Sequence, residues 1–204
     1  MAERTATHEP ARRLDRRAAS GPLGPAPLAA ALTVIAAAAL AARFAHPAPI
    51  WGREAVEVTL GQRPLGDLVE DLRHAGGPPL WILVLHVWQA IVGTSDLAVR
   101  ILPGVLTLLT LPLVALLGRR LGGRPLGRDL ALLVAISPYG LAIGSDAGPA
   151  AFLVLLVSAG AFALVDALDR SSARSLGLLA TVTAALLWTH YWSAPLVAAT
   201  ALVV

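Results

Sequence analysis

The chain has 204 residues, of which 56% are hydrophobic and 14% are charged. A soluble domain carries roughly 25% charged residues, so this chain lacks the polar side chains needed to cover a water-exposed surface. The hydrophobicity excludes disorder for most of the chain, and the absence of cysteine excludes disulfides and thiolate metal sites. The net charge is +3 and all 16 cationic side chains are arginine. These arginines form short clusters between apolar runs, which indicates an integral membrane protein rather than a nucleic-acid-binding surface.

Residues 1–27 are polar and contain Arg12 and Arg13. No clear cleavage site precedes the apolar run that begins at Leu28, so we expect a disordered cytoplasmic tail followed by a retained helix. Six apolar runs are expected to span the membrane, whereas the run 79–93 is too short, because 13 helical residues rise only about 20 Å against about 30 Å of hydrocarbon. The apolar runs are 28–45, 79–93, 101–118, 129–144, 149–168, 176–190 and 193–204.

Arginine counting places the short run 79–93 in the outer interface. The N-terminal tail, the 119–128 cluster and the loop of Arg170 and Arg174 then all lie inside, as the positive-inside rule requires. The sequence therefore predicts an all-α, multi-pass bundle in the plasma membrane with a cytoplasmic N-terminus. Its external loop 46–100 should carry amphipathic interfacial helices at 54–60 and 65–73.

This topology brings four ionisable residues from separate parts of the chain to the outer face. They are Glu54, Arg100, Asp146 and His190. Ionisable groups at membrane depth are costly, so these four are the functional candidates. We assign other acids, Glu57 among them, to the wet faces of surface helices.

Six short motifs resemble those of GT-C membrane glycosyltransferases of the family 39 type, which includes protein O-mannosyltransferases and aminoarabinose transferases. The resemblance runs from residue 28 to 204 and covers the N-terminal part of that family's module, so the chain is expected to be a truncated or shortened relative. The motifs are WGREA at 51–55, GPPLW at 77–81, GTSDLAVRILP at 93–103, LGRRLG at 117–122, SDAGP at 145–149 after Ser137-Pro138, and THY at 189–191.

The resemblance implies a hexosyl or pentosyl transferase of the cell envelope. Such an enzyme moves a sugar from a polyprenyl-phosphate donor to an acceptor hydroxyl at the outer face, with inversion. Glu54 would be the general base and Arg100 would neutralise the lipid phosphate. Asp146 would orient the acceptor or a divalent cation, and His190 and Tyr191 would line the donor pocket. The acceptor is a lipid, a glycan or a protein.

Three polar positions depart from the family's pattern. Arg53 stands where the family has an aspartate, and Gly77 replaces a histidine for which His74 is a nearby stand-in. Gly148 replaces an arginine. We therefore add Arg53 and His74 to the candidate substrate-binding residues. The departures also leave open a non-catalytic GT-C-like protein that binds lipid-linked sugar or a partner enzyme. A small transporter or assembly subunit is a third and weaker hypothesis.

Overall fold

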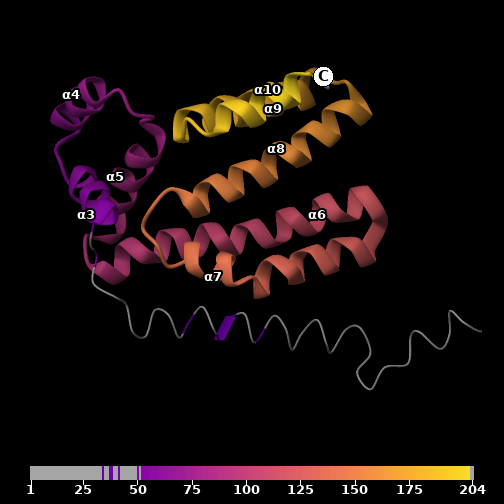
Figure 1. Cartoon of the computed structure of the whole chain (residues 1–204), viewed down its shortest axis with the longest axis horizontal. Helices are drawn as coiled ribbons and strands as arrows, with labels where there is room; N and C mark the ends of the chain where they lie inside the picture. The colour runs from indigo at the N-terminus through magenta and orange to yellow at the C-terminus, as the bar shows by residue number, and fades with distance from the viewer. Residues whose placement is uncertain (1–33, 35–36, 39–40, 42–49, 51, 203–204) are drawn as a thin grey trace, which may run out of the picture.

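A computed structural model of the chain describes residues 34, 37, 38, 41, 50 and 52–202. The predicted tail 1–27 and almost all of the predicted first span 28–45 lie outside these residues. The described part is helical and contains no strand, which agrees with the predicted all-α class (Figure 1). The helices are α3 (Gly52–Gly61), α4 (Leu65–Ala75), α5 (Leu80–Val92), α6 (Asp96–Ile136), α7 (Pro138–Ile143), α8 (Ala150–Arg170), α9 (Ala173–Thr189) and α10 (Ser193–Ala201).

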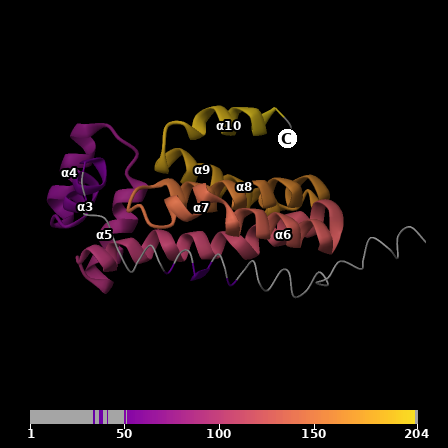
Figure 2. The ribbon, with the colours of Figure 1, turned by 60° about the horizontal axis from the view of Figure 1, so that its bottom comes forward.

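Three short helices, α3 to α5, gather beside one end of the long helices, as Figures 1 and 2 show. Their bounds confirm the predicted helices at 54–60 and 65–73 and the short helix at 79–93. Pro64 precedes α4 and Gly76 ends it with φ of +63°, a left-handed conformation that glycine adopts without steric cost. Pro79 precedes α5. Proline is tolerated at a helix start because the backbone N–H that it lacks would have no partner within the helix.

Helix α3 packs against helix α5. Trp81, Ile82 and Leu85 of α5 are buried in the main hydrophobic cluster. Two polar contacts fix the far end of α3 on α5: His86 Nδ1 lies 2.9 Å from the carbonyl oxygen of Gly61, and Gln89 Nε2 donates to that of Val58 at 3.1 Å. Apolar burial and these hydrogen bonds together set where the first turn of α3 points.

The helix α6 is a hairpin of two legs. Gly122 and Gly123 leave the helical conformation, and Gly123 has a φ of +82°, which favours glycine. The legs touch at two further glycines: a Cβ placed on Gly118 would stand 2.7 Å from the Cα of Gly127. The 119–128 arginine cluster therefore lies at the tip of a hairpin.

The predicted span 129–144 is not one helix. Ser137 is extended, with φ of −61° and ψ of 125°, and Pro138 begins the separate helix α7. The proline ring disfavours a helical conformation at the preceding residue, and the Ser137 side chain then caps α7 by accepting from Gly140 N. The return leg of α6 ends at Ile136 for this reason.

Two helices are long and apolar enough to cross a membrane, α6 and α8, within the residues that the structure describes. The shorter helices α5 and α9 are also apolar. Together with many exposed large hydrophobic side chains, such as Ile91 and Trp192, these helices make a membrane the natural environment of this part of the chain. The number of spans and their orientation stay predictions.

The contact between the legs of α6 gives a stability prediction. Gly118→Ala should lower the melting temperature of the purified protein in detergent, because the added methyl meets backbone that cannot move aside. Overpacking of this kind costs about 1–3 kcal/mol, and the gain in helix propensity returns only about 1 kcal/mol. Gly177→Ala in α9 is the matched control, since its Cβ meets nothing within 4 Å. Equal melting temperatures for the two variants would contradict the packing.

Candidate functional site

Three segments that are far apart in the chain meet at the end where α3 to α5 gather. Glu54, in the first turn of α3, accepts a hydrogen bond at Oε1 from the backbone N–H of Ala147 at 2.9 Å. Its other oxygen, Oε2, lies 3.3 Å from Nη2 of Arg100 in the second turn of α6. One carboxylate thus joins α3, α6 and the loop between α7 and α8. The structure thus brings Glu54 and Arg100 together with the loop that carries Asp146.

The Glu54–Arg100 pair is largely withdrawn from solvent. The side chains are 14% and 7% exposed. Breaking a buried pair costs about 3–5 kcal/mol, because the remaining charge is left without compensation. The Arg100 guanidinium, which we expected at a lipid phosphate, is directed to Glu54.

Asp146 and Arg53 lie near Glu54, and the three side chains line one cavity. Asp146 is exposed, and its Oδ1 accepts from Gly148 N at 3.0 Å, which shapes the loop into a tight turn. A Cβ on Gly148 would lie 3.5 Å from Arg53 Nη2 and 3.3 Å from Asp146 Oδ1. The guanidinium of Arg53 therefore lies over Gly148. Two departures from the family's pattern meet here, since an arginine from position 53 covers the glycine that replaces an arginine at 148.

Glu57 is a part of the site that the sequence analysis missed. Its side chain is only 14% exposed, and its Oε2 accepts from Nε1 of Trp81 at 2.9 Å. Its Oε1 lies 3.7 Å from Nε of Arg53. Burial raises the pKa of Glu57, while the hydrogen bond from Trp81 and the charge of Arg53 oppose this rise. We had placed Glu57 on a wet helix face, although its position four residues after Arg53 was a signal for an ion pair.

A cavity of about 310 Å³ opens at this point and is lined by Gly52, Arg53, Glu54 and Asp146. Its wall carries two carboxylates that face one guanidinium. Such a surface suits a hydroxyl-rich ligand, because carboxylates accept hydrogen bonds and Arg53 balances part of their charge. Among the described residues, no group of three or more His, Asp or Glu could hold a metal ion.

The remaining candidates lie apart from the lining of this cavity. His74 is exposed at the end of α4 and bonds through Nδ1 to the carbonyl oxygen of Glu70. Nδ1 of His190 accepts from Trp192 N at 3.2 Å. The Tyr191 hydroxyl donates to the carbonyl oxygen of Gly76. Tyr191 thus ties the loop after α9 to the end of α4, which puts this group at the same end of the molecule as the cavity.

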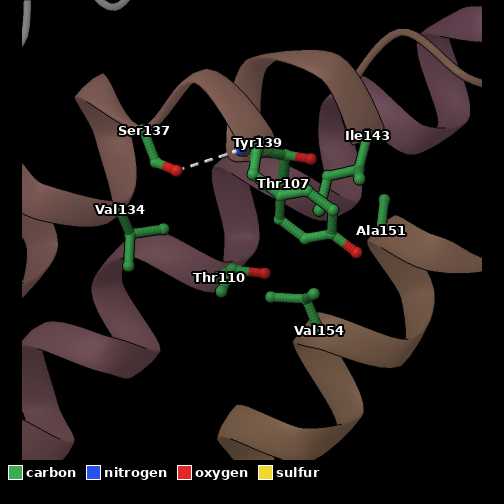
Figure 3. Close-up of a pocket in the computed structure, with 9 residues that line it drawn as sticks. Thr107, Thr110, Val134, Ser137, Tyr139, Ile143, Ala151 and Val154 are labelled. Atoms are coloured by element: carbon green, nitrogen blue, oxygen red, sulfur yellow. Dashed lines mark hydrogen bonds between the residues drawn. The ribbon is translucent and has the colours of Figure 1, made fainter.

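A second, apolar cavity of about 130 Å³ lies between the two legs of α6, α7 and α8 (Figure 3). Ile143 and Ala151, which flank the Asp146 loop, are part of its lining. Figure 3 shows the Tyr139 ring among Thr107, Ala151 and Val154. The buried Thr107 hydroxyl finds no hydrogen-bond partner in the described part of the chain. An apolar space therefore lies next to the loop that carries a polar cavity.

The raised pKa of Glu57 predicts how stability depends on pH. The folded state holds this proton more tightly than the unfolded state, so the free energy of unfolding falls as pH rises from about 4.5 through the raised pKa. Glu57→Gln removes the free-energy cost of burying the charged carboxylate and keeps an oxygen that accepts from Trp81. The stability of the variant relative to the wild type should therefore increase from pH 4.5 to pH 7, as measured by thermal unfolding. Glu70→Gln, an exposed substitution on α4, is the control. A difference that does not change with pH would contradict the burial of the Glu57 charge.

Comparison with known proteins identifies the family. A sequence model described as dolichyl-phosphate-mannose-protein mannosyltransferase matches residues 76–204, which include Arg100, Asp146, His190 and Tyr191 but not Glu54. Searches of curated proteins and of solved structures give no significant match. The family match spans well over half of the chain and follows the helices that carry Arg100 and the Asp146 loop. The chain therefore belongs to the dolichyl-phosphate-mannose-protein mannosyltransferase family.

Proposed function

We propose that the protein transfers a sugar, with inversion, from a polyprenyl-phosphate donor to an acceptor hydroxyl at the outer face of the plasma membrane. Family membership supports a mannosyltransferase-type glycosyltransferase that uses a lipid-linked donor. The observation that carries the proposal is the cavity that is lined by both Asp146 and Glu54, the latter oriented by Arg100 and the Ala147 N–H.

Glu54 is proposed as the general base. Its two held oxygens fix its direction, and a carboxylate has about four acceptor positions, so room remains for an acceptor hydroxyl. As the acceptor oxygen attacks the anomeric carbon, its proton passes to Glu54. The bond from the anomeric carbon to the phosphate oxygen breaks, and the lipid phosphate leaves with the electron pair. Attack from the side opposite the leaving phosphate inverts the anomeric carbon.

Asp146 is proposed to orient the acceptor. Its carboxylate is exposed at the cavity, and its loop position is held by the bond to Gly148 N. An acceptor held between Glu54 and Asp146 has its hydroxyl positioned before reaction, which lowers the entropic part of the barrier. His190, Tyr191 and His74 remain proposed substrate contacts at the same end. The apolar space beside Ala151 supports a lipid-bearing donor.

Replacement of either acid tests the proposal. Glu54→Gln and Asp146→Asn should each reduce transfer by at least about 10²-fold, the low end for general acid–base catalysis. The assay follows release of lipid phosphate from polyprenyl-phosphate mannose by the purified chain. Asp71→Asn on α4, where the carboxylate pairs with Arg63 and is not part of the cavity lining, is the control and should retain activity. Full transfer by Glu54→Gln would remove its role as base.

A second candidate function is a non-catalytic protein that binds a lipid-linked sugar or a partner enzyme. It is favoured by Arg53, which stands where the family has an aspartate and lies in the cavity wall. Turnover by the purified wild-type chain would exclude this alternative. No turnover, with intact folding and donor binding, would favour it.

The orientation across the membrane is also part of the proposal. The hairpin tip of α6 lies far from the cavity end (Figure 1), and Arg120 there pairs with Asp166 of α8 at 2.9 Å. Because short arginine-rich turns favour the cytoplasmic side, this arrangement supports a cavity at the outer face and a cytoplasmic N-terminus.

Cysteine labelling tests this orientation, because the chain has no native cysteine. Thr94→Cys, near the cavity end, should react with a membrane-impermeant maleimide added to intact cells. Gly122→Cys and Ala173→Cys, at the opposite end, should react only after permeabilisation. Labelling of position 122 from outside would overturn the orientation.

A further inference from the structure

The resemblance assigns the lipid phosphate to Arg100, but the geometry of Arg100 does not suit that role. Its side chain is 7% exposed and its guanidinium faces Glu54. The cavity lining includes Arg53 and omits Arg100. Arg53 has a side chain that is 66% exposed. A ligand in the cavity therefore meets Arg53 and does not meet Arg100.

The electrostatics of the cavity make Arg53 decisive for an anionic ligand. Glu54 and Asp146 on the cavity wall repel a phosphate. Arg53 supplies the attraction that offsets this repulsion, and a guanidinium forms charge-assisted hydrogen bonds to phosphate oxygens. Without this cation, the cavity would present two carboxylates alone.

Glu57 sets where the Arg53 guanidinium lies. The carboxylate is held from one side by Trp81 Nε1 and contacts Arg53 Nε from the other. Nη2 of Arg53 then lies over Gly148, at 3.5 Å from where a Cβ on Gly148 would stand. A guanidinium has five N–H donors, so one contact at Nε leaves donors for a ligand.

We propose that Arg53 is the phosphate-contacting residue of the cavity and that Glu57 is the positioning residue that holds it there. The inference rests on the proposed function and names the group in this chain that receives the phosphate of the lipid donor. Trp81, Glu57 and Arg53 form one chain of contacts from the core to the cavity rim. Glu57 acts through Arg53 and does not touch the ligand.

Binding of farnesyl phosphate to the purified full chain tests the proposal without any need for transfer. Arg53→Gln should weaken binding at least about tenfold, the loss expected for a charge-assisted hydrogen bond. Binding of farnesol, the same lipid without phosphate, should not change. Inorganic phosphate should compete with farnesyl phosphate in the wild type and compete less in Arg53→Gln, which separates the phosphate contribution from that of the lipid.

A double-mutant cycle isolates the role of Glu57. Glu57→Gln should weaken farnesyl phosphate binding by a few fold in the wild type and have no further effect in Arg53→Gln, because it acts through that residue. The matched control is the exposed pair of Arg63 and Asp71 on the same external segment. Arg63→Gln and Asp71→Asn make the same changes of charge away from the cavity and should leave binding unchanged.

Four results would overturn the inference. They are normal farnesyl phosphate binding by Arg53→Gln, an equal loss of farnesol binding, an equal loss in Arg63→Gln, and an undiminished effect of Glu57→Gln in the Arg53→Gln background. A chain that binds through Arg53 but transfers no sugar would count against the proposed function alone. An active chain whose binding ignores Arg53 would count against this inference alone.

Discussion

The buried ion pair between Glu54 and Arg100 is the interaction on which the site depends. It joins residues 46 positions apart, and the bond from Ala147 N to Glu54 joins residues 93 positions apart. Neither charge tolerates the loss of the other, because burial removes the water that would otherwise compensate it. The pair therefore holds the first turn of α3 against α6 and the loop before α8. Separating these three segments would break the pair and leave a buried charge without compensation. The pair therefore maintains the cavity between them.

Around this pair the site balances three carboxylates with two guanidinium groups. The three carboxylates have different environments. Glu54 is bonded at both oxygens, Glu57 is mostly buried and bonded to Trp81, and Asp146 is exposed. Residues of one chemical type thereby gain separate roles. In the proposed transfer, Glu54 would be the base, Glu57 would support Arg53, and Asp146 would orient the acceptor.

A second group of charged side chains lies at the end of the molecule opposite the cavity. Gly122 and Gly123 reverse the chain, so that the arginines of the hairpin meet acids at the end of α8. Arg120 pairs with Asp166 and lies 5.4 Å from the centre of the Phe162 ring, a cation–π contact. The long legs between the two ends carry apolar side chains, as a lipid-exposed segment must. Charge is thus confined to the two ends of the described bundle.

Composition and periodicity determined the helical class and the short helices at 54–60, 65–73 and 79–93, because these depend on local pattern. The positions of the arginine-rich turns predicted that Glu54, Arg100 and Asp146 lie at one end. Tertiary structure alone decided which charges touch. The sequence did not reveal that Arg100 faces Glu54, that Arg53 lies over Gly148, or that Glu57 bonds to Trp81. Each of these contacts joins segments that are distant in the chain and meet only through packing. The break at Ser137 was missed although Pro138 signalled it, because hydrophobicity continues through 129–144 while backbone conformation does not.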